Sequence, residues 1–161
     1  VNDADPVCEI NLLGFSWGGV NALSVAGHLN GDGQIPVSHR RVARMVLLDT
    51  FQPFSSGRMQ VPENVESVLS MRHSIAPEHD CSRAAPFGPY MGFSPLCAAD
   101  QDCQDYDYSL SPDRIFIDQW GDGFWGDQVG HCLVSAVAHE QVVAFVRGEP
   151  LFGPLPSQAY D

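Results

Sequence analysis

The amino-acid sequence predicts one α/β domain built on a mostly parallel β-sheet. Two apolar runs, residues 7–13 and 42–48, have the composition of buried strands. The first leads through a glycine-rich turn into a segment with helical spacing of apolar residues. A third run at 114–120 precedes a final helical pattern. Strands that alternate with helices favour parallel pairing, because a parallel crossover needs a connection of helix length. The 161 residues suffice for one domain with a substantial core.

The remaining elements follow in chain order. A helix is expected at 18–29, and the turn residues of 30–34 end it. Residues 61–75 fit a strand or a short helix, and their spacing does not decide between the two. Residues 76–112 are rich in proline, glycine and cysteine without a clear period, so we expect an insertion without regular structure. A glycine-rich loop then leads to His131, which begins the last helix.

The charge composition narrows the class of partner. The net charge is −12, and all eight basic residues are arginines. Such an acidic composition argues against a nucleic-acid partner and against binding to anionic membranes. The apolar runs are too short for stable membrane insertion. No signal peptide opens the chain, which begins at Val1, as a mature or trimmed product would.

Five cysteines favour an oxidising compartment. Cys81, Cys97 and Cys103 lie in the expected insertion, where a disulfide would hold a long segment in place. Cys8 and Cys132 lie in apolar stretches, and we expect them to be buried thiols or to pair with each other. The chain has no C-x-x-C pair, which disfavours a metal site, and we expect neither a metal nor a cofactor. These features favour a secreted or periplasmic protein.

The most specific motif is Gly14-Phe15-Ser16-Trp17-Gly18, which matches G-x-S-x-G. A strand before it and a helix after it are the context of a nucleophile elbow. In such an elbow the serine is lifted clear of the sheet at the N-terminus of a helix. The backbone of the serine is strained, and we expect side chains at positions 14 and 18 to collide with the neighbouring strand and helix. The alternative is a glycine-rich turn in which Ser16 only caps the helix.

A serine hydroxyl needs a base that takes its proton and an acid that orients the base. His131 is the best candidate for the base, because it follows a strand and a glycine-rich loop and precedes a helix. Asp49 is the best candidate for the acid, because it ends the strand at 42–48, where ligands bind in layered α/β folds. An aspartate there can also be a plain turn former. The histidines that are weaker candidates are His28, His39, His73, His79 and His139, and the competing acids are Asp118, Asp122 and Asp127.

Three pieces of the chain resemble the C-terminal half of an α/β-hydrolase. They are residues 12–19 around the serine, residues 42–50 ending in Asp49-Thr50, and Gly130-His131. The position of the acid is similar to that in pancreatic-type lipases and thioesterase domains. The resemblance covers most of 7–53 and 113–147, and residues 54–112 match neither branch.

The resemblance implies a three-layer α/β-hydrolase-like fold with a mostly parallel sheet. It also implies that Ser16 is the nucleophile, Asp49 the acid and His131 the base, in the chain order usual for this architecture. The backbone N–H of Trp17 would be one donor of the oxyanion hole.

One feature departs from the family's pattern. An α/β-hydrolase has several strands before its elbow, and one of their loops supplies the second oxyanion donor. Here the elbow comes at residue 16, so we expect a partial domain whose N-terminal strands are absent from this chain. A strand of buried composition is unfavourable at an open edge. We therefore expect either a fragment or a complementing N-terminal chain, for example from cleavage of one precursor.

The function that these features predict is hydrolysis of carboxylic esters, as in an esterase or a lipase acting on a small-molecule or lipid ester. The same triad would serve a thioesterase or an acyltransferase, and free thiols at 76–112 would favour that alternative. A third alternative is a non-catalytic binding half of a hydrolase-like fold. Aromatic residues near the motifs would line an acyl pocket or belong to the core: Phe15, Trp17, Phe51, Phe54, Trp120, Phe124 and Trp125.

Overall fold

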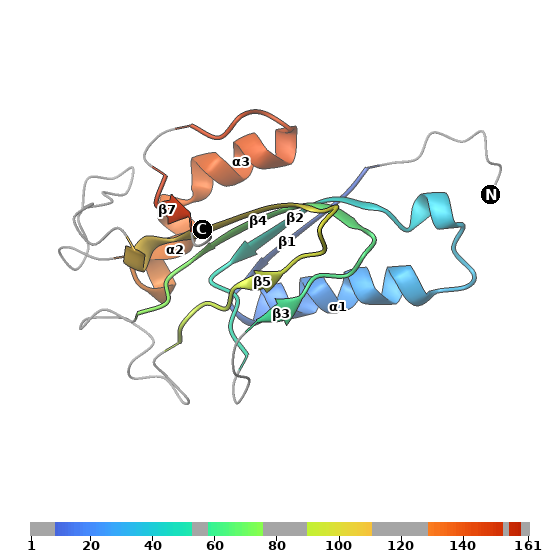
Figure 1. The fold of residues 1–161 in the computed structure, drawn as a ribbon, viewed down its shortest axis with the longest axis horizontal. Helices are drawn as coiled ribbons and strands as arrows, with labels where there is room; N and C mark the ends of the chain where they lie inside the picture. The colour runs from blue at the N-terminus through green and yellow to red at the C-terminus, as the bar shows by residue number, and fades with distance from the viewer. Residues whose placement is uncertain (1–8, 53–57, 76–89, 111–128, 153–154, 159–161) are drawn as a thin grey trace.

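A five-stranded sheet forms the centre of the protein, with helices on both of its faces (Figure 1). The computed structural model describes residues 9–52, 58–75, 90–110, 129–152 and 155–158. The strand order is β1-β2-β4-β6-β7, in which β1 to β6 pair in parallel and β7 pairs with β6 antiparallel. The strands are β1 (Ile10–Phe15), β2 (Val42–Leu48), β4 (Val65–Arg72), β6 (Asp102–Asp107) and β7 (Ser157–Gln158). The prediction of an α/β fold with a mostly parallel sheet is confirmed.

The register of the strands brings their carboxyl ends to one edge of the sheet. Phe15 at the end of β1 lies opposite Leu48 of β2, which in turn lies opposite Met71 of β4. Arg72 at the end of β4 lies opposite Asp107 of β6. The residues that follow these strands therefore lie close together, although they are far apart in the sequence.

The helices are divided between the two faces. Helix α1 (Trp17–Gly31) lies on one face, and α2 (His131–Val137) and α3 (His139–Arg147) lie on the other (Figure 1). Strand β2 alternates accordingly, since Met45 and Leu47 belong to the hydrophobic cluster of α1, and Val46 and Leu48 belong to the cluster of α2 and α3. This alternation explains why β2 reads as a continuous apolar run, because a strand buried on both faces needs no polar side.

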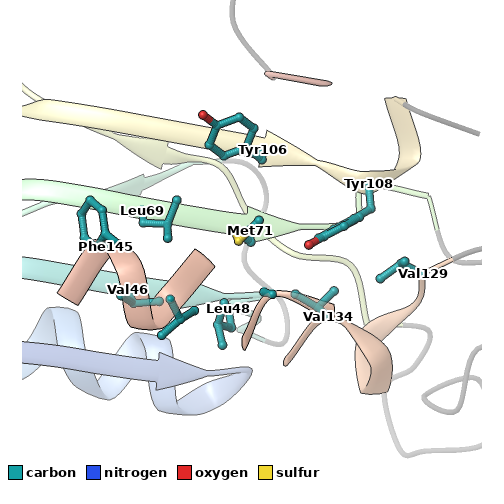
Figure 2. Close-up of a cluster of buried hydrophobic side chains, with 11 residues drawn as sticks. Val46, Leu48, Leu69, Met71, Tyr106, Tyr108, Val129, Val134 and Phe145 are labelled. Atoms are coloured by element: carbon teal, nitrogen blue, oxygen red, sulfur yellow. The ribbon is translucent and has the colours of Figure 1, made fainter. Parts of the chain in front are cut away.

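The larger cluster packs α2 and α3 against the middle of the sheet. Figure 2 shows Leu69 and Met71 of β4 beside Val46 and Leu48 of β2, with Phe145 of α3 among them. The cluster continues through buried residues on β6, on the 3-10 turn after it, before and on α2, between α2 and α3, and on α3. They are Tyr106, Tyr108, Val129, Val134, Ala138 and Val142. Its apolar side chains fix α2, and with it the position of the first residue of that helix.

Strand β6 corrects the expectation that residues 76–112 form an insertion without regular structure. It is an integral strand of the main sheet, and β5 (Pro95–Leu96) pairs with β3 (Met59–Gln60) in a second, small sheet. The sequence of β6 is polar, so hydrophobic periodicity does not identify it. Its buried carboxylates, Asp105 and Asp107, are instead paired with Arg72, whose guanidinium nitrogens lie 2.8–3.2 Å from their oxygens.

The other expected elements are close to those observed. The ambiguous segment 61–75 contains a strand, β4, and the expected helix at 18–29 runs from Trp17 to Gly31. The last helix is divided at Ala138 into α2 and α3. The predicted strand at 114–120 lies outside the described residues. In the described part of the chain, no helix is long and apolar enough to cross a membrane.

The cysteine predictions are correct in part. Cys97 and Cys103 form a disulfide that ties the segment after β5 to β6. Cys132 is exposed and also disulfide-bonded, so the expectation of a buried thiol is wrong for this residue. It lies on α2, whose opposite face carries the apolar contacts. Cys8 and Cys81 lie outside the described residues. Disulfides are typical of proteins that fold in an oxidising compartment.

The packing around β4 predicts a strong response to truncation of Leu69. This side chain is fully buried in the larger cluster, so Leu69→Ala should lower the free energy of unfolding by about 2–5 kcal/mol. Leu96→Ala is the matched control, because Leu96 is 40% exposed, and its effect should stay within about 1 kcal/mol. Urea denaturation of the three proteins measures the difference, and equal midpoints for the two variants would contradict the described core.

Candidate active site

Ser16 occupies a strained turn between β1 and α1. Its backbone has φ 54° and ψ −125°, a conformation that non-glycine residues rarely adopt. The Ser16 N–H donates to Leu48 O at 2.9 Å, and the Ser16 carbonyl accepts from the N–H groups of Gly19 and Phe51. The side chain makes no capping hydrogen bond to α1. A serine that only caps a helix has extended backbone and bonds to the first turn, so the capping alternative does not describe Ser16.

The glycines around Ser16 are required by close backbone approach, but not in the expected pattern. A Cβ at Gly14 would lie 2.3 Å from the carbonyl oxygen of Gly18, and a Cβ at Gly19 would lie 1.9 Å from Thr50 Oγ1. A Cβ at Gly18 would meet nothing within 4 Å. The expected collision at position 18 is therefore wrong, because Gly18 faces away from the sheet and Gly19 faces the chain that follows β2.

Asp49 follows β2 directly and is completely buried. Its φ of 44° lies in the left-handed region, which aspartate tolerates better than most residues. Its N–H donates to Met71 O at 2.8 Å, which extends the ladder between β2 and β4 by one residue. The carboxylate points to two histidines. Oδ2 lies 2.5 Å from Nδ1 of His131, and Oδ1 lies 2.8 Å from Nδ1 of His73.

His131 is the first residue of α2, and its side chain is buried against the carboxyl edge of the sheet. The imidazole stacks on the ring of Phe15, with 4.9 Å between ring centroids, and Tyr90 contacts it edge-on at 5.2 Å. Because Phe15 precedes Ser16 in the chain, this stack holds His131 beside the strained turn. The sequence-predicted residues Ser16, Asp49 and His131 are thus brought to one end of the sheet.

The hydrogen bond to Asp49 determines which nitrogen of His131 carries the proton. An ionised carboxylate only accepts hydrogen bonds, so Nδ1 of His131 is the donor. In the neutral imidazole the second nitrogen, Nε2, is then the unprotonated one. This is the tautomer that a general base uses to take a proton from a hydroxyl group.

His73 is the residue of the site that the sequence analysis ranked too low. It follows β4 directly, is 0% exposed, and gives Asp49 Oδ1 two donors, its backbone N–H at 2.9 Å and its ring Nδ1–H at 2.8 Å. The available signal was its position after the second strand that follows the elbow. That signal was lost because residues 61–75 could not be assigned to a strand.

A backbone segment covers the buried pair. Gly92 N–H donates to His73 O at 2.9 Å, and Phe93 N–H donates to Thr50 O at 2.8 Å. A Cβ at Gly92 would lie 2.4 Å from Asp49 Oδ1, so only glycine allows this approach. The neighbouring ring of Phe51 stacks with Tyr90 at 4.3 Å. Residues 90–93 thereby close over Asp49 and His73.

Some of the other predicted site residues are described by the structure, and the rest lie outside the described ranges. Trp17 is the first residue of α1, and a helix leaves the N–H groups of its first turn without intrahelical acceptors. Its side chain is exposed, as is that of Phe15, whereas Phe51 is half-buried.

In the described ranges, no three His, Cys, Asp or Glu side chains are placed to hold a metal ion. The predicted site residues that lie outside the described ranges are Phe54, His79, Asp118, Trp120, Asp122, Phe124, Trp125 and Asp127.

The comparisons with known proteins give no match. No family model matches the chain, and neither a curated protein nor a solved structure does.

The geometry of the turn predicts that Gly14 and Gly18 respond differently to the same substitution. Gly14→Ala should destabilise the protein by about 1–3 kcal/mol, because the added methyl group meets the backbone of the first turn of α1. Gly18→Ala should leave the stability unchanged or raise it by up to about 1 kcal/mol, because alanine favours the helix and the position is open. Thermal unfolding followed by circular dichroism compares the two variants, and equal losses would contradict this description of the turn.

Proposed function

We propose that the protein is a serine hydrolase that cleaves carboxylic esters, with Ser16 as nucleophile, His131 as general base and Asp49 as the acid that orients His131. The observation that carries the proposal is the hydrogen bond between His131 Nδ1 and Asp49 Oδ2. It joins residues that are 82 positions apart, at the edge of the sheet where Ser16 lies in its strained turn. Burying a carboxylate costs free energy, and buried pairs of ionisable groups cluster at functional sites. The burial of Asp49 against His131 near such a serine therefore supports a joint role for the three groups.

The acylation step follows from these positions. Ser16 Oγ attacks the carbonyl carbon of the ester while Nε2 of His131 takes the hydroxyl proton. The carbonyl oxygen becomes an oxyanion, which the Trp17 N–H and the dipole of α1 stabilise. The tetrahedral intermediate then collapses, the bond to the alcohol oxygen breaks, and His131 returns the proton to the leaving alkoxide. Asp49 stays ionised and stabilises the imidazolium that forms in between.

The deacylation step reverses the roles with water in place of the alcohol. His131 Nε2 takes a proton from a water molecule, whose oxygen attacks the acyl carbon bound to Ser16. The second intermediate collapses to a free carboxylic acid, and His131 returns the proton to Ser16 Oγ. The aromatic rings of Phe15 and Tyr90 beside His131 supply apolar surface for an acyl chain.

Two features support the finer parts of the proposal. The parallel sheet with helices on both faces is compatible with an α/β-hydrolase-like fold, in which the triad follows in the order serine, acid, histidine. The acid after the strand that follows the elbow resembles the arrangement of pancreatic-type lipases and thioesterase domains. The Cys97–Cys103 disulfide favours a secreted or periplasmic protein and thus an ester rather than a carrier-bound thioester. Thioesterase or acyltransferase chemistry with the same triad is the less favoured alternative, because free thiols at these positions were its expected sign.

The complementing N-terminal segment remains part of the proposal. Among the described strands, β1 lies at an edge of the sheet, and its Leu13 is 56% exposed. An apolar strand at an open edge is a template for pairing with another strand. A strand added beside β1 would cover Leu13 and would bring the loop that carries a second oxyanion donor close to Ser16.

The first test of the proposal is the reactivity of Ser16. A fluorophosphonate probe should label the wild-type chain at one serine, and Ser16→Ala should abolish labelling, because the probe reacts only with an activated hydroxyl group. Ser24→Ala is the matched control, since Ser24 is exposed on the same helix and should not affect labelling. Intact-mass spectrometry measures both. Labelling that persists in Ser16→Ala would contradict the proposed nucleophile, and absence of labelling in the wild type would favour a non-catalytic binding role.

The second test concerns Asp49. Asp49→Asn keeps the size of the side chain and tolerates the left-handed backbone, but the amide favours the wrong tautomer of His131, so labelling should slow by roughly 10³–10⁴-fold. Asp100→Asn, at an exposed position, is the control. Stopped-time labelling gives the rates. An unchanged rate in Asp49→Asn would place the acid among Asp118, Asp122 and Asp127.

A further inference from the structure

We propose that His73 is a positioning residue that orients the Asp49 carboxylate toward His131. The inference rests on the proposed function, because it assigns a role in the same triad to a residue outside it. The two oxygens of the Asp49 carboxylate have different partners. Oδ1 accepts two hydrogen bonds from His73 and Oδ2 accepts one from His131, so each oxygen has its own histidine.

His73 does not contact a substrate in this arrangement. It is 0% exposed, as is Asp49, whereas His131 is 5% exposed and lies on Phe15 next to Ser16. The ring of His73 is 6.4 Å from that of His131 between centroids, with Asp49 bonded to both. Any effect of His73 on Ser16 must therefore pass through the carboxylate.

The need for a second donor comes from the freedom of the aspartate side chain. The torsion that turns a carboxylate about its own axis has broad minima, so one hydrogen bond to one oxygen leaves the direction of the other oxygen poorly fixed. The backbone N–H of His73 is such a single donor. The ring Nδ1–H reaches the same oxygen from a second direction, which fixes Oδ2 toward His131.

The burial of Asp49 is an energetic reason for a second donor to its carboxylate. A carboxylate that is removed from water is unfavourable unless its oxygens accept hydrogen bonds, and Asp49 is completely buried. Three donors, two from His73 and one from His131, replace the water that an exposed aspartate would bind. Without the ring of His73, water or a turned carboxylate would compete with the bond to His131.

His73 is itself held rigidly. Its carbonyl accepts the Gly92 N–H, and the residue before it, Arg72, is bound by Asp105 and Asp107 on β6. These are the charged groups next to His73, and they pair with one another rather than with Asp49, since Arg72 is turned toward β6. The position of the imidazole is thus determined by the ends of β4 and β6 and does not depend on substrate.

The test compares three substitutions that differ in the position of a donor. Asparagine places its amide N–H close to where Nδ1–H of histidine lies, glutamine places it farther out, and leucine has the size of asparagine without a donor. His73→Leu and His73→Gln should slow fluorophosphonate labelling of Ser16 by roughly 10–100-fold, the loss found when the hydrogen-bond partner that orients a metal ligand is removed. His73→Asn should restore the rate to within about threefold of wild type, because the donor is retained.

A second readout does not depend on activity. In wild-type protein labelled with ¹⁵N-histidine, the nuclear magnetic resonance spectrum of neutral His131 should show the Nδ1–H tautomer. In His73→Leu and His73→Gln the Nε2–H tautomer should gain population, and in His73→Asn it should not. Circular dichroism confirms that each variant is folded, and if His73→Leu does not fold, the pair His73→Gln and His73→Asn decides.

The outcomes separate the two proposals. Equal loss in all three variants, or no loss in any, would overturn the positioning role, since the position of the donor would not matter. A wild type that is not labelled would contradict the hydrolase proposal. The tautomer of His131 would then still test the positioning role of His73. An unchanged spectrum in His73→Gln and His73→Leu would overturn that role.

Discussion

The buried carboxylate of Asp49 is the constraint on which the rest of the site depends. A charge with no exposure to water requires donors at fixed positions, and these come from two separate elements, the residue after β4 and the first residue of α2. The segment before β5 covers the carboxylate through Gly92. Each of these elements is anchored by its own packing. The aspartate therefore couples the order of the strands to the position of His131.

The same edge of the sheet carries a second buried ionic group. Arg72 pairs with Asp105 and Asp107, and Ser94 Oγ–H donates to Asp105 at 2.8 Å. Arg72 and His73 are consecutive residues with different partners: Arg72 forms ion pairs with β6, and His73 donates to Asp49. The ion pairs hold β4 and β6 in register at the point where His73 leaves the strand, so a polar network supports the site from one side while the apolar cluster of α2 supports it from the other.

Sequence reasoning predicted the elements that are determined by local patterns of residues. The apolar runs predicted β1 and β2, the helical spacing predicted α1, and the motif predicted a strained serine, which is observed at φ 54°. It failed for β6, whose buried carboxylates are stabilised by ion pairs with Arg72 and do not follow an apolar pattern. It also misjudged Gly18 and ranked His73 among the weak candidates, since the direction of a side chain at a turn depends on the neighbouring strand. The roles of Ser16, Asp49 and His131 remain predictions, although the contact between Asp49 and His131 is present in the structure.

By itself the sequence determined the identity and order of the candidate reactive groups: a serine in a G-x-S-x-G turn, an aspartate at a strand end and a histidine before a helix. These features are local, because backbone strain, strand composition and helix starts are set by neighbouring residues. The tertiary structure decided which histidines meet the aspartate, and it placed His131 on Oδ2 and His73 on Oδ1. Contacts between residues 24 and 82 positions apart depend on strand register and helix packing, and no local pattern in one sequence encodes that distance.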